Sequence, residues 1–215
     1  MTTSATQFLP TAEIAIDIAD VARKTLTEQA HREVDRLTES IFFDKTGLCR
    51  RSIVMADVGG GRTSSLWLAV SVASALGKAL GFAVRVLSVG GNVPERQLGP
   101  GSTDMNVTAG HCILERVGES ALAGDNPNLL VGRLASLRAV GSVVIVHMAC
   151  LEDQVDIPVR TSPIDGVVLL VRASQTRRAA LEAIEKRLAM ARLPLIGSVL
   201  LDRVYPIPEK LYKLL

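Results

Sequence analysis

Five short aliphatic runs, separated by stretches of helical character, constrain the fold of this chain more than any other feature. They span residues 52–56, 84–89, 142–146, 166–171 and 196–201. Near-continuous apolar runs of this length are typical of strands in a parallel sheet, which are buried on both faces. Because helical patterns stand between them, the sequence predicts an α/β fold with a doubly wound, mainly parallel sheet flanked by helices.

The segments between the runs are expected to be helical in most places. Helical patterns cover residues 14–41, 64–80, 112–122, 128–139 and 176–191. Residues 93–109 are rich in Gly, Pro and Thr and are expected to form a long surface loop. Aromatic residues make up 3% of a chain that is 48% hydrophobic, so the core must be aliphatic. We expect a flexible start, residues 1–12, and one domain over residues 13–215.

Charge and cysteine content argue against several classes of function. The formal net charge of +2 is too small to indicate a nucleic-acid partner or a membrane surface. Cys49, Cys112 and Cys150 are odd in number and widely spaced, and no signal peptide is evident at Met1. We therefore expect reduced thiols in a cytoplasmic protein. The apolar runs are broken by charge well short of a bilayer span.

A glycine-rich cluster lies between the first aliphatic run and the helical stretch at residues 64–80. It consists of Gly59, Gly60, Gly61, Arg62, Thr63 and Ser64. A strand, a glycine turn and a helix in this order allow backbone N–H groups to face an anion. A phosphate-binding P-loop also uses a Lys for the phosphates and a Ser or Thr hydroxyl for Mg²⁺. Gly61 and Thr63 fit that pattern, whereas Arg62 stands at the Lys position and Ala56 at the first glycine position.

The glycine cluster has two other interpretations. A dinucleotide-binding turn would need an acidic residue at the end of the second strand to hold a ribose. Residues 88–92 contain none, so that interpretation is weak. Alternatively, the glycines serve only a tight turn at the start of a helix. The cluster alone does not separate this last possibility from a P-loop.

Motifs along residues 33–215 together resemble the bacterial tyrosine autokinases of capsule and exopolysaccharide synthesis, relatives of the MinD/ParA-type ATPases. The resemblance rests on their order and spacing. The matching segments are Glu33 with Arg36, the glycine cluster, Asn126-Pro127, Asp-Gly-Val at 165–167, Val-Arg-Ala at 171–173, Thr-Arg-Arg at 176–178, and the Tyr-Pro-Ile-Pro ending at 205–212. The resemblance implies a P-loop NTPase-like fold and, in active family members, transfer of phosphate from ATP to tyrosine.

Three departures from the family pattern point to a degenerate site. The family carries Asp-x-Asp after the second strand, but residues 82–94 contain no acid. It ends the third strand in Asp-Thr-Pro-Pro, whereas His147 stands at this Walker B position. Mg²⁺ requires oxygen ligands, so neutral His147 cannot replace the carboxylate, and Arg62 does not reproduce a compact ammonium. These departures imply no catalytic residue, no metal and no expected cofactor, with at most weak ATP or ADP binding without Mg²⁺.

The charged helix before the first strand is predicted to carry partner contacts. In the family a Glu-x-x-Arg-x-x-Arg motif there supports ring-like self-association, and this chain has Glu33, Arg36 and Glu39 at that spacing. Glu39 reverses the charge of the second Arg, which favours an Arg-bearing paralogue over a homo-oligomer. The resemblance implies the cytoplasmic part of a membrane polysaccharide co-polymerase, or a related kinase, as the partner. Tyr205 and Tyr212 are expected to pack and not to accept phosphate.

Several residues that resemble functional groups have simpler interpretations. The pairs His111-Cys112 and His147 with Cys150 do not predict zinc, because the spacing His-x-x-Cys is common. His147 is expected to end a buried strand, with its ring at the former metal position. A group of arginines near the last helix is expected to be solvated: Arg172, Arg177 and Arg178.

Two functions from different classes are compatible with the sequence. The first is a non-catalytic, pseudokinase-like module of exopolysaccharide synthesis, located in the cytoplasm or held at the inner membrane by a partner. The second is a divergent, ATP-binding tyrosine autokinase or ATPase. Phosphoryl transfer works by positioning and by charge stabilisation through Mg²⁺, so the loss of both acidic motifs favours the first.

Overall fold

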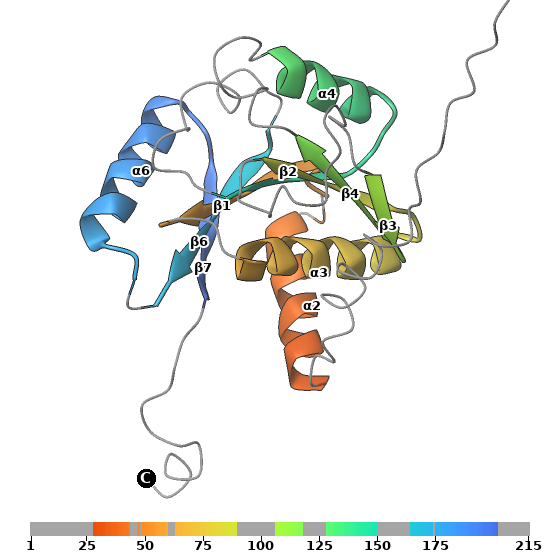
Figure 1. Ribbon diagram of the computed structural model, residues 1–215, viewed down its shortest axis with the longest axis horizontal. Helices are drawn as coiled ribbons and strands as arrows, with labels where there is room; N and C mark the ends of the chain where they lie inside the picture. Colours follow the sequence, from red (N-terminus) through yellow and green to blue (C-terminus); the bar gives the residue numbers. More distant parts are fainter. Residues whose placement is uncertain are drawn as a thin grey trace, which may run out of the picture.

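The computed structural model describes residues 28–43, 47, 49–59, 63–89, 106–117, 128–149, 164–173 and 175–201. They form a seven-stranded sheet with helices on both faces (Figure 1). The strands are β1 (Ser52–Val58), β2 (Val84–Val89), β3 (Asn106–Ala109), β4 (Cys112–Val117), β5 (Val144–Met148), β6 (Gly166–Arg172) and β7 (Leu195–Leu201). The helices are α2 (Glu28–Phe42), α3 (Thr63–Leu80), α4 (Asn128–Ala139) and α6 (Arg178–Met190).

The strand order is β3-β4-β2-β5-β1-β6-β7, and every neighbouring pair except β3 with β4 is parallel. The five aliphatic runs are all strands of this sheet, within two residues of the expected bounds. The predicted doubly wound, mainly parallel α/β fold is therefore confirmed. Such a sheet carries ligands outside the carboxyl ends of its strands, which makes that edge the place to examine.

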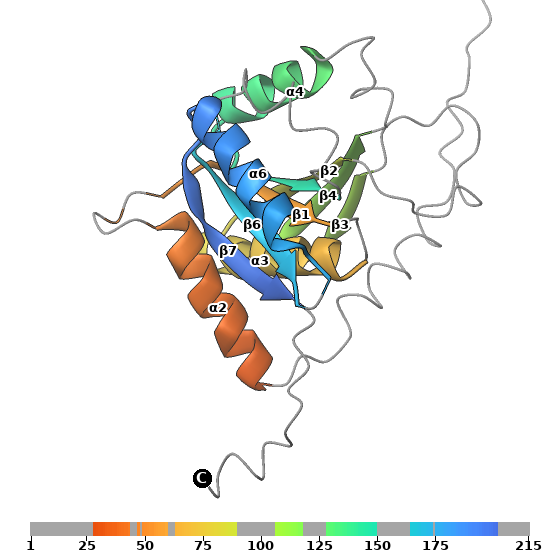
Figure 2. The ribbon, with the colours of Figure 1, turned by 90° about the vertical axis from the view of Figure 1, so that its left-hand side faces the viewer.

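Two aliphatic cores lie on the two faces of the sheet. Figure 1 shows α2 and α3 below the sheet and α4 above it, and Figure 2 shows α6 on the same side as α4. Alternate residues of each strand face opposite sides. In β1, Ile53 and Met55 belong to the core between the sheet and helices α2 and α3, whereas Val54 and Ala56 belong to the core between the sheet and helices α4 and α6. This alternation decides which strand residues face α3 at the carboxyl edge.

The segment around residue 112 was predicted as a helix, and this prediction is wrong. Residues 112–117 form β4, and the end of the predicted loop at 93–109 forms β3. The two strands pair as a hairpin in which Ala109 lies opposite Cys112, so only two residues connect them. Gly110, at φ +57°, takes the left-handed conformation that such a turn needs. Six residues are too few to separate a helical from a strand period, and the Gly-His pair was the signal for a hairpin.

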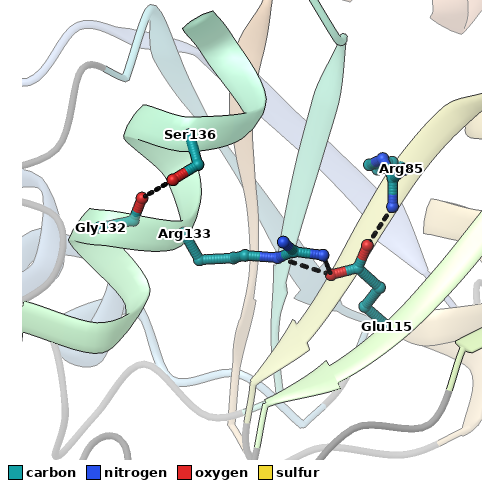
Figure 3. Close-up of polar contacts among 5 residues, drawn as sticks. All are labelled: Arg85, Glu115, Gly132, Arg133 and Ser136. Atoms are coloured by element: carbon teal, nitrogen blue, oxygen red, sulfur yellow. Dashed lines mark hydrogen bonds and ion pairs between the residues drawn. The ribbon is translucent and has the colours of Figure 1, made fainter. Parts of the chain in front are cut away.

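A buried carboxylate fixes α4 to the sheet. Glu115 of β4 is 7% exposed and contacts Arg85 of β2 and Arg133 of α4 (Figure 3). The Nε and Nη2 atoms of Arg133 donate to the same Glu115 oxygen at 3.0 and 2.8 Å. A buried carboxylate requires such partners. Together with the buried leucines of α4, this pairing sets the position of the helix over β2 and β5.

Several sequence expectations fall on residues outside the described part. They concern the flexible start at 1–12, the helical pattern at 14–27, Asn126-Pro127, Cys150, and the two tyrosines Tyr205 and Tyr212. Within the described residues, none of the helices combines the length and the apolar character that crossing a bilayer requires.

Candidate functional site

The candidate site lies where β2, β5, β1 and β6 end and α3 begins. Along each strand, the side chains that face α3 are apolar until the last one, which is polar. In β1 the series Ile53, Met55 continues to Asp57. The four final residues are Ser88, His147, Asp57 and Arg172, taken in the order of the strands in the sheet. We call these four residues the polar row; all of them are buried.

His147 lies in the polar row between two serine hydroxyls. Its Nδ1 is 3.2 Å from Ser88 Oγ, and its Nε2 is 3.0 Å from the Oγ of Ser65, a buried residue near the start of α3. A neutral imidazole has one donor and one acceptor nitrogen, and each hydroxyl can take the complementary role. The ring thus links β2, β5 and α3. The prediction that His147 ends a buried strand is confirmed.

Burial keeps the His147 ring uncharged. Its side chain is almost wholly removed from water, which lowers its pKa from 6.5 to about 4, while the nearby charge of Asp57 opposes the shift. Desolvation disfavours the charged imidazolium, and the serine hydroxyls add no charge to compensate it. At neutral pH the polar row therefore holds an uncharged ring at the end of β5, between Ser88 and Asp57.

Asp57 and Arg172 form an ion pair with no exposed side-chain surface on either partner. Nη2 of Arg172 donates to Asp57 Oδ2 at 2.8 Å, and Nε lies 3.5 Å from Oδ1. A buried carboxylate of this kind requires a paired cation and hydrogen bonds. The expectation that Arg172 is solvated is therefore wrong; Arg177 and Arg178 are exposed as expected.

The start of the glycine cluster is held by the same strand end. Thr176 Oγ1 donates to the carbonyl oxygen of Val58 at 2.8 Å and accepts from the backbone N–H of Arg172 at 3.0 Å. Gly59 has φ +115°, a conformation that side chains rarely allow, and a Cβ there would meet Thr176 Oγ1 at 3.7 Å. A glycine at position 59 thus meets a backbone requirement, so it is more than a spacer.

The remaining glycine-cluster residues are only partly within the described residues. Gly60, Gly61 and Arg62 lie outside them, and for Thr63 and Ser64 the backbone is described as the first turn of α3. Whether these groups contact a phosphate stays a prediction. The flanking elements that the prediction needs, β1 before the cluster and α3 from Thr63, are present.

A magnesium ion fits this set of side chains poorly. Among the described residues at the ends of β2, β5, β1 and β6, Asp57 is the one carboxylate, and Arg172 already neutralises it. Mg²⁺ favours oxygen ligands in octahedral arrangement and is reluctant to lose its water. The remaining polar groups of the row are one hydroxyl and one neutral imidazole. No step through a metal ion is derived from these residues.

The predicted partner residues lie together on the solvent side of α2. Glu33 and Arg36 form an exposed ion pair at 3.7 Å, and Glu39 is exposed, whereas Val34, Thr38 and Ile41 are buried. The other discounted residues also separate in space. His111 precedes β4 at the amino edge of the sheet, where Cys112 pairs with Val84, and His147 lies at the carboxyl edge, paired with Ser88.

Sequence reasoning missed two of the four residues of the polar row. Asp57, near the end of β1, was not singled out, and neither were Ser65 and Ser88. The alternation of side chains along each strand could have identified Asp57 and Ser88. In all four strands, the residue two positions after the last apolar side chain that faces α3 is polar. The pairing of Asp57 with Arg172, residues 115 positions apart, has no local signal.

Comparisons with known proteins agree with this architecture. No protein-family model and no curated protein sequence matches the chain. Among solved structures, the chimerical protein CapA2B2 superposes with a TM-score of 0.59 at 14% identity, covering 84% of this chain and 87% of that one. The BceF tyrosine kinase domain gives 0.59 at 13% identity, covering 87% and 85%. The kinase domain of the Escherichia coli tyrosine kinase ETK gives 0.51 at 12% identity, covering 84% and 78%.

The chain has the fold of these tyrosine kinase domains. The match runs over most of its length, as the motif order along residues 33–215 predicted. At identities of 12–14% the likeness is one of fold, and function has to be argued from the site.

Proposed function

We propose that this chain is a non-catalytic, pseudokinase-like module of exopolysaccharide synthesis or export. In this proposal it uses a tyrosine kinase fold to bind the cytoplasmic part of a membrane co-polymerase or a catalytic paralogue. The fold likeness and the motif order support the choice of system. The chemistry of the polar row supports the loss of catalysis.

One observation carries the proposal: the buried place of His147 between Ser65 and Ser88. In a working phosphotransfer site this strand end supplies a carboxylate for the water shell of Mg²⁺, and charge stabilisation by the metal is the main source of rate. The neutral His147 ring supplies no anionic oxygen for that water shell, and both of its nitrogens already contact serine hydroxyls. The nearby Asp57 is committed to Arg172 and cannot take over.

A divergent ATP-binding tyrosine autokinase or ATPase is the alternative. It is favoured by the geometry at the loop start, where Gly59 has φ +115° and Thr176 bonds the carbonyl oxygen of Val58 ahead of the first turn of α3. Backbone N–H groups at a helix start bind phosphate without any side chain. ATP or ADP bound weakly and without Mg²⁺ is compatible with the non-catalytic module as well.

A transfer assay with radiolabelled ATP and Mg²⁺ separates the two functions. We expect neither phosphotyrosine nor released phosphate above the level of an Arg62→Ala variant. Turnover by the unchanged protein that Arg62→Ala abolishes would contradict the proposal. Thermal unfolding with ATP measures binding apart from turnover, since a ligand at ~100 times its dissociation constant stabilises the folded state by about 2.7 kcal/mol.

The partner is tested on α2. Glu39→Arg restores the family's cation, and we expect it to raise self-association and to weaken capture of an Arg-bearing paralogue. The effect should be modest, since exposed ion pairs contribute about 0.2–1 kcal/mol. Glu185→Arg, an equal charge change at an exposed site on α6, is the control and should change neither. If both variants behave alike in light scattering, Glu39 is not a contact.

A further inference from the structure

Three helix-to-strand turns lie together along the amino edge of the sheet, opposite the candidate site. They join α3 to β2, α4 to β5 and α6 to β7. The strands begin in register: Val144 of β5 lies between Arg85 of β2 and Ser52 of β1, and Val167 of β6 lies beside Leu195 of β7. Since neighbouring strands are about 4.8 Å apart, β2 and β7 start roughly 19 Å from each other.

Each of these turns, or a residue directly flanking it, presents an apolar side chain to solvent. Phe82 is 44% exposed, Val140 76%, Met190 74% and Leu195 40%. Among the described residues there is a single other exposed large hydrophobic side chain, Leu200. Exposed apolar residues scattered singly are ordinary. Here, four of the five exposed large hydrophobic side chains lie at one edge, at turns that come from both faces of the sheet. They are therefore clustered.

Cations surround these apolar tips. The last turns of α3, α4 and α6 carry Lys78, Arg138 and Arg187, and the exposed Arg51 and Arg192 precede β1 and β7. Asp165 is the one carboxylate of the described residues immediately before these strands, and Arg138 pairs with it at 3.3 Å. The helix dipole explains a cation in a last helical turn. It does not explain Arg51, which precedes β1 and follows no helix directly.

Arg192 occupies a backbone position that favours glycine. At the end of α6, Leu193 N–H donates to Leu188 O and Arg192 N–H to Ala189 O. At the end of α4, Ser142 and Gly141 make the same two bonds, to Leu137 and Arg138. The glycine of that α4 turn has φ +78° and Gly81 after α3 has φ +76°, whereas Arg192 takes φ +56°. A non-glycine residue held in this conformation is strained and points to a function.

We propose that this amino edge docks on an anionic lipid surface. We define the docking edge by Phe82, Val140, Met190 and Leu195 as the inserting tips and by Arg51, Lys78 and Arg192 as the headgroup contacts. Apolar tips that project from separate turns, with cations between them, match the acyl and phosphate layers of a membrane interface. They are spread along an edge of roughly 19 Å, whereas a protein interface centres on one packed apolar core. The net charge of the whole chain hides this local concentration.

Sedimentation with lipid vesicles tests the proposal on the whole chain. We expect binding to vesicles that contain phosphatidylglycerol, little binding to phosphatidylcholine alone, and a decline as salt shortens the screening length from about 10 Å at ~0.1 M to about 3 Å at ~1 M. Val140→Asp with Met190→Asp should abolish binding. Because both side chains are exposed, the double variant should fold, which circular dichroism checks.

Arg192→Gly gives the sharpest readout. Relief of the backbone strain should raise the melting temperature, while loss of one headgroup contact should weaken vesicle binding about fivefold, the equivalent of about 1 kcal/mol per cation. Arg177→Gly removes an equal charge from an exposed site at the opposite edge, before α6, and should leave binding unchanged.

Several results would overturn the proposal. One is no binding to phosphatidylglycerol vesicles; another is an equal loss in both arginine variants, which would indicate unspecific attraction. A third is a soluble acidic polypeptide that displaces the unchanged protein from vesicles and still binds the double variant Val140→Asp with Met190→Asp. That result would assign the edge to an acidic protein. The test does not involve ATP, so its failure leaves the proposed function untouched.

Discussion

Removing one partner of the buried pair between Asp57 and Arg172 should destabilise the protein far more than breaking an exposed pair of the same length. Arg172→Met keeps much of the side-chain volume but leaves the Asp57 carboxylate buried without a cation. Neither partner has exposed side-chain surface, so water cannot replace the lost partner. Breaking such a pair costs about 3–5 kcal/mol.

The chain contains a matched control. Arg178 and Glu182 are also 2.8 Å apart, but their side chains are 91% and 52% exposed. Arg178→Met should therefore cost less than about 1 kcal/mol. Because the distance between nitrogen and oxygen is equal in the two ion pairs, a difference in destabilisation between Arg172→Met and Arg178→Met measures the effect of burial.

Urea unfolding followed by circular dichroism measures both variants. With a denaturant slope of about 2 kcal/mol per M, the Arg172→Met midpoint should fall by about 2 M, while that of Arg178→Met should barely move. Adding Asp57→Asn to Arg172→Met removes the orphaned charge and should recover most of the loss, which keeps the test decisive if the single variant does not fold. Similar small shifts in both single variants would refute the reasoning.

Three further predictions concern groups away from the ion pair. The pKa of His147 is 6.5 in the unfolded chain and about 4 in the folded protein, so between pH 6.5 and pH 4 the unfolded chain binds more protons and the free energy of unfolding falls with pH by roughly 3 kcal/mol. Urea unfolding at several pH values should show a smaller fall for His147→Gln. Gly77→Ala should destabilise by about 1–3 kcal/mol despite better helix propensity, because its Cβ would lie 2.6 Å from His111 O and 2.7 Å from His111 Cβ; Gly132→Ala, with open space around it, should instead stabilise α4 by about 0.5–1 kcal/mol in the same assay. The Cys112 thiol, whose pKa burial raises to about 12, should resist iodoacetamide at mildly alkaline pH until the protein unfolds, with mass spectrometry reporting the modified site.

The sequence predicted the central strands because burial on both faces leaves an unambiguous apolar run. The hairpin of β3 and β4 was missed, since β4 mixes Cys112, Glu115 and Val117 in six residues that suit either period. The partners of Glu115 explain the outcome: its charge is satisfied by Arg85 from β2 and Arg133 from α4, which only the folded sheet brings together.

The part of the candidate site that the sequence predicted is the position of His147, because a histidine within an apolar run is conspicuous. The place of His147 in an apolar run predicted the buried strand end, which is confirmed, while the missing carboxylate stays a prediction. The protonation of its ring and its two serine partners depend on packing between β2, β5 and α3, which no local pattern encodes. For the same reason Arg172, polar in sequence, was taken to be solvated, whereas it is buried against Asp57.

The dependence of ATP affinity on Mg²⁺ tests the central claim most directly. Isothermal titration of the protein with ATP, in the presence of Mg²⁺ and then of a chelator, compares the two affinities. We expect that Mg²⁺ does not increase the affinity, because His147 is neutral and Asp57 is paired with Arg172. ATP binding that is tenfold or more tighter with Mg²⁺, a gain of about 1.4 kcal/mol, together with phosphate transfer to tyrosine, would contradict it.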